Sequence, residues 1–162
     1  MVFSAYFQYP EGEENQHIEA LVFLAKPSIK DWERVFSCTG TRRFKQGEIV
    51  IQKGDMDQAL YIVSQGSLEV IIPEGMQAAL TRIATIEAGE VFGEQSFFDK
   101  KPRSQTVRAM TDGEVLVLSR ESFDVLAGRE PDLGRTILFD LARILSIRLR
   151  QTTAMMMELA SH

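Results

Sequence analysis

Cysteine and histidine are almost absent from this chain. Cys38 is the only cysteine, and the two histidines, His17 and His162, lie outside the central part of the sequence. One thiol forms no internal disulfide, no CxxC zinc knuckle and no four-thiolate iron–sulfur site. Without a central imidazole, a histidine metal triad and a Ser-His-Asp or Cys-His catalytic set are also excluded. We therefore expect a protein with no enzymatic activity and no metal cofactor, located in a reducing cytoplasm.

Positive charge and long apolar runs are also scarce. Lysine and arginine number 18 against 23 acidic residues, which gives a net charge of −5. Nucleic-acid binding by phosphate neutralisation needs the opposite balance, so no direct nucleic-acid partner is expected. The longest local apolar stretch, ALVFLA at 20–25, is far shorter than the roughly 18 residues that cross a bilayer. The N-terminus lacks the features of a secretory signal.

The 162 residues, 44% of them hydrophobic, predict one domain with a single main core. Residues 1–27 form an N-terminal arm, in which the aromatics Phe3, Tyr6, Phe7 and Tyr9 favour partial order. Residues 28–130 form the folded domain, and residues 131–162 a long C-terminal helix. The chain leaves no room for a separate DNA-reading or catalytic domain of ordinary size.

Short β-rich runs separated by glycine turns fill the central region. They lie at 49–51, 60–63, 68–72, 80–86, 91–92, 106–109 and 115–118. Strands this short, at intervals of roughly 8 to 12 residues, indicate an antiparallel sandwich or barrel. The predicted fold is mainly β, a double-stranded β-helix (jelly roll) with short flanking helices and a long C-terminal α-helix.

Capping residues delimit the predicted helices. Ser28 with Asp31 begins a short helix that ends at Gly40, and Ser119 begins another that Gly128 ends. Pro131 opens a third, which continues without glycine or proline from 135 to about 160. That helix is about 40 Å long, more than one face of a small barrel needs. Either part of it packs on the same helix of a second subunit, or it wraps its own barrel.

One segment, FGEQSFFDKKPRSQTVRA at 92–109, combines groups that suit a small sugar phosphate. Gly93 lets the backbone approach a ligand, and Glu94 can accept a hydrogen bond from a ribose hydroxyl. Arg103, which follows a proline, can pair with phosphate, and the hydroxyl of Ser104 comes next. The backbone N–H groups at the start of a helical turn favour an anion.

These residues resemble the cyclic nucleotide-binding domains of catabolite-activator-type regulators, kinase regulatory subunits and gated channels. FKQGEIVIQKGDMDQALYIVSQGSLEV at 44–70 is similar to the opening β-roll of that family, and 92–109 to its phosphate-binding cassette. The resemblance implies that Glu94 binds the ribose 2′-hydroxyl and Arg103 the cyclic phosphate. The residues that it assigns to the ligand are Gly93, Glu94, the amides of Gln95 and Ser96, Arg103 and Ser104.

Two features depart from the family pattern. Gln95-Ser96 stands where the family commonly has leucine and a small residue. On the long helix, the activators place small hydroxyl residues against the base, whereas this chain has Arg148 and Leu149 there. In some other members an arginine of this helix contacts the base. Arg148 is therefore a candidate base-side ligand, and the alternative is an arginine that extends along a helix interface to reach water.

The function expected from this resemblance is a cytoplasmic homodimeric sensor. It binds a 3′,5′-cyclic mononucleotide, cAMP in preference to cGMP, and repositions its C-terminal helix for an unknown protein effector. A different class of function is a ligand-free interaction scaffold, in which Glu94 and Arg103 pair with each other. A third is the sensor fragment of a larger transcription regulator or channel, although the initial methionine and polar end favour a complete chain.

Overall fold

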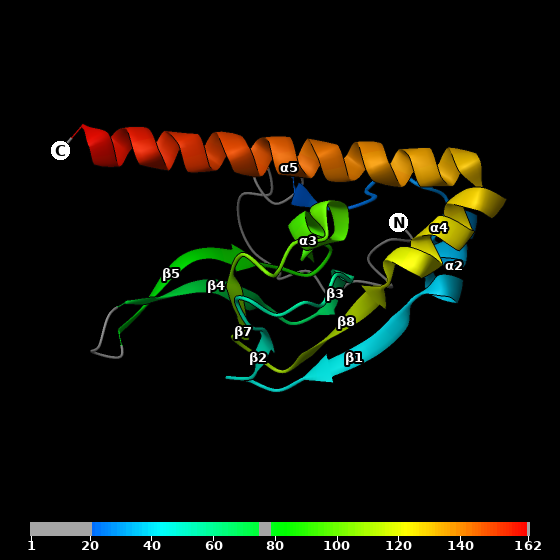
Figure 1. Cartoon of the computed structure of the whole chain (residues 1–162). Helices are drawn as coiled ribbons and strands as arrows, with labels where there is room; N and C mark the ends of the chain where they lie inside the picture. Colours follow the sequence, from blue (N-terminus) through cyan, green and yellow to red (C-terminus); the bar gives the residue numbers. More distant parts are fainter. Residues whose placement is uncertain (1–20, 75–78, 162) are drawn as a thin grey trace.

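Two four-stranded antiparallel sheets face each other in the computed structural model, which describes residues 21–74 and 79–161 (Figure 1). The strand order is β1-β8-β3-β6 in the first sheet and β2-β7-β4-β5 in the second. This arrangement confirms the predicted jelly roll. The strands are β1 (Gly40–Phe44), β2 (Ile49–Ile51), β3 (Leu60–Gln65), β4 (Leu68–Glu74), β5 (Ala79–Ile86), β6 (Val91–Phe92), β7 (Thr106–Ala109) and β8 (Gly113–Leu118).

Strand β3 is buried on both faces and divides the core in two. Leu60 and Ile62 belong to the apolar cluster under the helices, whereas Tyr61 and Val63 belong to the cluster between the sheets. Successive side chains of a strand point to opposite faces, so one strand can supply both clusters. The continuous apolar run at 60–63 is therefore the sequence of a central strand.

Within residues 21–74 and 79–161, the helices that flank the sheets are α2 (Ile29–Cys38), α3 (Glu94–Asp99), α4 (Arg120–Arg129) and α5 (Pro131–Ala160). The predicted caps are present. Ser28 Oγ accepts a hydrogen bond from the Asp31 N–H at 3.2 Å, and the Asp31 carboxylate accepts one from the Ser28 N–H at 3.1 Å. At α4, Ser119 Oγ accepts from the Ser122 N–H at 3.1 Å. The long C-terminal helix begins at the predicted proline.

One predicted glycine stop is correct in position and the other is wrong: Gly40 directly follows Thr39, the C-cap of α2, whereas α4 continues past Gly128. Helix α2 ends at Cys38 because Thr39 is already extended, and Gly40 is the first residue of β1, paired with Val117. Gly128 lies inside α4, which continues to Arg129. That helix ends because Glu130 precedes a proline, which disfavours the helical conformation in the residue before it.

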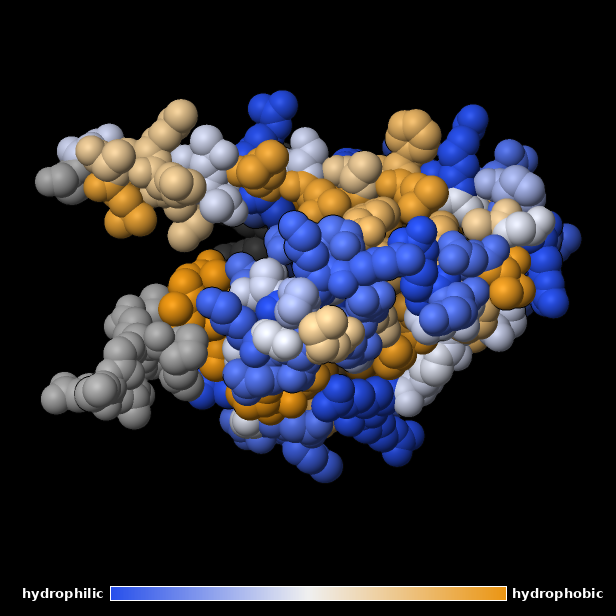
Figure 2. All heavy atoms as spheres, viewed as in Figure 1, coloured by the Kyte–Doolittle hydropathy of each residue, from blue (hydrophilic) through white to orange (hydrophobic). Residues whose placement is uncertain are grey.

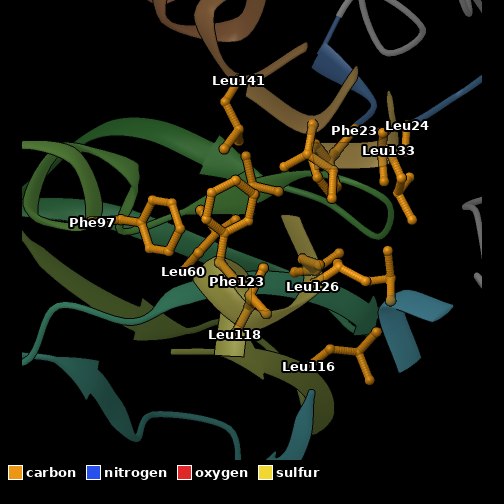
Figure 3. Close-up of a cluster of buried hydrophobic side chains, with 14 of the residues drawn as sticks. Phe23, Leu24, Leu60, Phe97, Leu116, Leu118, Phe123, Leu126, Leu133 and Leu141 are labelled. Carbon is orange, nitrogen blue, oxygen red and sulfur yellow. The ribbon is translucent and has the colours of Figure 1, made fainter. Parts of the chain in front are cut away.

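Helix α5 contributes only its first half to the core. Its buried residues stop at Ile144, and the second half of the helix continues past the core and over β4 and β5 as an overhang (Figures 1 and 2). In Figure 3, Leu141 points toward Phe97 and Phe123, which come from α3 and α4. Close approach of α4 and α5 requires Gly134, because a Cβ there would lie 2.7 Å from that of Ala127.

The described part of the predicted arm, residues 21–27, packs against α5. Val22, Phe23 and Leu24 are buried. The Leu24 N–H donates to Asp140 Oδ2 at 2.7 Å, and Arg143 donates to the Val22 carbonyl at 2.9 Å. The aromatic residues predicted to order the arm, Phe3, Tyr6, Phe7 and Tyr9, lie outside the described residues. None of the helices in the described ranges is both long enough and apolar enough to cross a membrane.

Candidate functional site

Gly93 connects β6 to α3 in a left-handed conformation, with φ of +80°. A Cβ at this position would lie 2.6 Å from Nη1 of Arg103 and 3.0 Å from the carbonyl oxygen of Ala59. The first contact is shorter than real Cβ atoms tolerate and the second is unusually tight, so the site needs glycine for space as well as for backbone conformation. The space that Gly93 leaves is occupied by an arginine.

Arg103 is a buried cation, with 2% of its side chain exposed. Its Nη1 donates to the Gly93 carbonyl at 2.8 Å, and its Nη2 donates to the Ala59 carbonyl at 2.7 Å and to Asp57 Oδ2 at 2.6 Å. The guanidinium also lies over the ring of Tyr61, 5.5 Å from its centroid. The Nε of Arg103 is buried without a hydrogen-bond partner, so one donor of a fixed cation remains unused.

Asp57 is the counter-ion that holds Arg103. Burial opposes ionisation of Asp57, but hydrogen bonds from Tyr61 and Arg103 outweigh it and lower the pKa of the carboxyl. The Tyr61 hydroxyl donates to Asp57 at 2.6 Å, and its ring stacks on Phe92 with centroids 5.0 Å apart. Burial, together with this bond to Asp57, raises the pKa of Tyr61. The network keeps Asp57 ionised and Tyr61 protonated at neutral pH.

Glu94, the first residue of α3, pairs with the long helix. Its Oε1 forms an ion pair with Nη1 of Arg148 at 2.9 Å, and Nη2 of Arg148 donates to the Val91 carbonyl at 2.6 Å. The same Nη2 lies 4.0 Å from Oε2 of Glu90. The alternative in which Glu94 and Arg103 pair with each other is therefore wrong, because each has a different partner.

All seven predicted site residues line one cavity of about 980 Å³. The cavity lies between the second sheet, the cassette and the overhang of α5, where Figure 2 shows the surface hollowed. Its volume is at the upper end of the range typical of small-molecule sites. The predicted residues that it brings together are Gly93, Glu94, Gln95, Ser96, Arg103, Ser104 and Arg148.

These residues differ in exposure and in the hydrogen-bonding groups that they present to a ligand. Ser96 is buried, whereas Gln95 and Ser104 are exposed at the cavity. The amides of Gln95 and Ser96 are in the first turn of α3, where a helix provides no carbonyl acceptor for them. Gln95 departs from the family pattern in being polar. It is tolerated because its side chain is exposed at the cavity and not buried in the core.

Sequence reasoning missed two acceptors of Arg103, Asp57 and Ala59, and also Glu90, which lies 4.0 Å from Arg148. Asp57 and Ala59 lie in the loop before β3, and Glu90 lies in the loop before β6. Asp57 carries no local signal, because its partner is 46 positions away along the chain. Glu90 could have been suspected, since it is a charged residue in an otherwise apolar and glycine-rich run, AGEVFG at 88–93.

Residues 41–130 match the family model described as the cyclic nucleotide-binding domain. This chain belongs to the cyclic nucleotide-binding domain family. It is 35% identical over 112 residues to a cyclic AMP receptor protein of Thermus thermophilus, which covers 68% of this chain and 49% of that protein. It is 34% identical over 110 residues to a cAMP-dependent protein kinase regulatory subunit of Emericella nidulans, covering 67% of this chain and 26% of the subunit.

Among solved structures, this cyclic nucleotide-binding domain resembles the catabolite activator protein of Thermus thermophilus. The TM-score is 0.72 and the identity 28%, over 85% of this chain and 62% of that one. The domain thus spans half or less of the two curated relatives and less than two thirds of the solved protein. The family membership and the jelly-roll fold predicted from the cassette are confirmed.

The contact between Gly93 and Arg103 yields a first prediction. Gly93→Ala should destabilise the fold by about 1–2 kcal/mol for the left-handed backbone and by about 1 kcal/mol or more for the clash with the guanidinium. Gly47→Ala is the matched control, because Gly47 has φ of +83° but open space around its Cβ position. Urea unfolding measures both, and equal losses would contradict the steric role of Gly93.

Proposed function

We propose that this domain binds a 3′,5′-cyclic mononucleotide, cAMP in preference to cGMP, and acts as a cytoplasmic regulatory sensor. The observation that carries the proposal is the buried guanidinium of Arg103 at the cavity, held in place on three acceptors with its Nε donor unused. A preorganised cation with a free donor suits a single phosphate anion. The similarity to a cyclic AMP receptor protein and to a cAMP-dependent protein kinase regulatory subunit favours that nucleotide.

The remaining groups of the cavity suit the rest of the nucleotide. The Glu94 carboxylate accepts from the ribose 2′-hydroxyl, while Ser104 and the amides of Gln95 and Ser96 donate to the phosphate. Nη1 of Arg148, once released from Glu94, faces the base from α5. The wall offered to the base is apolar and comes from the second sheet and from the overhang of α5: Ile83, Met155 and Leu159.

Helix α5 is the element through which the domain would signal. It lines the cavity with its inner face, and its outer face carries an apolar stripe at 138, 142, 145 and 149. Intervals of four and three residues are those of a coiled-coil seam, and Leu138 and Leu149 in it are exposed. We therefore propose a homodimer through α5, whose position a bound nucleotide would change for a protein effector.

A ligand-free scaffold is the second candidate, and one observation favours it. Both arginines of the cavity already have carboxylate partners in the chain itself, Asp57 for Arg103 and Glu94 for Arg148. A site satisfied in this way does not require an anion. A thermal-shift panel separates the candidates, since cAMP raises the melting temperature of a sensor and leaves that of a scaffold unchanged.

The role of Arg103 is tested by calorimetry with cAMP. Arg103→Gln should weaken binding by about a hundredfold or more, because a buried charged contact to the phosphate is lost. This variant leaves Asp57 without its cation, so the double variant Asp57→Asn, Arg103→Gln is measured as well. If the double variant melts near the wild-type temperature and still binds cAMP as tightly as wild type, the assignment is wrong.

The role of Glu94 is tested with a matched ligand, 2′-deoxy-cAMP. Wild type should bind cAMP about tenfold or more tightly than the deoxy compound, since only cAMP can donate to the charged carboxylate. Glu94→Gln should reduce that preference to near unity while still binding both ligands. Equal affinities of wild type for cAMP and the deoxy compound would show that Glu94 does not bind the ribose 2′-hydroxyl.

The seam on α5 is tested by sedimentation equilibrium. Leu149→Glu should convert the dimer to a monomer, because it places a charge in the apolar seam. Met157→Glu is the control, since Met157 is equally exposed, at 67%, but lies off the 4-3 spacing. A wild-type monomer, or equal effects of the two variants, would refute a dimer built on this stripe.

A further inference from the structure

Glu90 is a buried carboxylate at the cavity that none of the proposed ligand contacts uses. It lies in the loop between β5 and β6 with 5% of its side chain exposed, and its carbonyl accepts from the Val63 N–H at 2.9 Å. Its Oε2 is buried without a hydrogen-bond partner. The nearest cation, Nη2 of Arg148, is 4.0 Å from that oxygen, beyond hydrogen-bonding distance.

Burial, modified by the neighbouring charges, brings the pKa of Glu90 near neutrality. Burial raises the pKa of Glu90 to about 7, with Arg148 on α5 opposing the shift and Glu87 on the same loop adding to it. Glu94 on α3 holds the guanidinium of Arg148 at 2.9 Å and so competes with Glu90 for it. With Arg148 committed to Glu94, Glu90 carries a proton for part of the time at neutral pH.

We propose that Glu90 is a positioning residue that receives Arg148 when a ligand takes Glu94, so that ligand binding is coupled to the release of one proton. The inference rests on the proposed function, since a ribose hydroxyl is what displaces Arg148 from Glu94. The two carboxylates form two alternative positions for one guanidinium. Without ligand, the Arg148 guanidinium pairs with Glu94, whereas Oε2 of Glu90, 4.0 Å away, has no hydrogen-bond partner.

The exchange needs little movement and balances in charge. Nη2 of Arg148 must approach Glu90 by about 1 Å to reach hydrogen-bonding distance, while Nη1 leaves Glu94 and turns to the base. The Glu90 carboxyl gives its proton to solvent and its oxygen accepts from Nη2. The bond between Nη2 and the Val91 carbonyl keeps the guanidinium in the cavity throughout.

The sign of the pH dependence follows from this exchange. Glu90 is ionised in the bound state and partly protonated in the free state, so raising the pH favours binding. With a free-state pKa of about 7 and a bound-state pKa well below it, affinity for cAMP should be about tenfold higher at pH 8 than at pH 6.

Calorimetry in buffers of different ionisation enthalpy measures the protons released when cAMP binds. Wild type should release about one proton per cAMP at pH 6 and about a tenth of one at pH 8. Glu90→Gln should release none and should bind with an affinity that does not change between these pH values. Glu87→Gln is the matched control: release should persist, with its midpoint at a lower pH because a charge that raises the pKa of Glu90 is gone.

Each result decides between the two proposals. Binding of cAMP by wild type with no proton release at pH 6 overturns the exchange and leaves the sensor intact. Release that persists unchanged in Glu90→Gln also overturns the role of Glu90. Absence of cAMP binding by wild type at both pH values overturns the sensor and the exchange together. If Glu90→Gln does not fold, the pH dependence of wild-type affinity alone decides.

Discussion

The burial of the Arg103 guanidinium constrains the rest of the site. A charge removed from water is tolerated only when acceptors surround it, and here they come from separate parts of the chain. Asp57 and Ala59 precede β3, and Gly93 follows β6. Strands β3 and β6 are neighbours in the first sheet, with Tyr61 opposite Phe92, so strand pairing brings the acceptors together. The cassette is therefore fixed by the fold itself and not by a ligand.

Helix α5 is one continuous element with two environments. Its first half is core, where Ile137, Leu141 and Ile144 are fully buried. Its second half has no protein beneath it in the described residues except the walls of the cavity, and large apolar side chains there stay exposed. Local stability follows buried contact, so the second half is the part of the helix that can move at low energetic cost. Arg148 lies at the junction of the two halves.

Most of the fold was predictable because its signals are local. Short β-rich runs between glycine turns marked the strands, and Ser28, Ser119 and Pro131 marked the helix starts. Gly40 marked the end of α2 correctly in position, whereas Gly128 failed as a stop because glycine permits a helix end without requiring one. Six of the seven site residues were located through the cassette resemblance, and Arg148 through the place of the long helix in the family. Asp57, the partner of Arg103, and Glu90, which lies 4.0 Å from Arg148, were not located, since pairing across a tertiary fold leaves no trace in local spacing.

The two arginines of the cavity differ in a way that fits a sensor. Arg103 has three fixed acceptors and almost no exposure, so moving it would leave Asp57 unpaired and break bonds to two backbone carbonyls. Arg148 is partly exposed, comes from the helix and has two carboxylates within 4.0 Å. Arg103 is already in place before a ligand binds. Its contact with a ligand therefore favours neither conformational state of the protein over the other. The differential affinity of a ligand for the two states of the protein must come from Arg148. Under the proposed function, Arg103 thus supplies affinity, and Arg148 supplies the coupling that turns affinity into a signal.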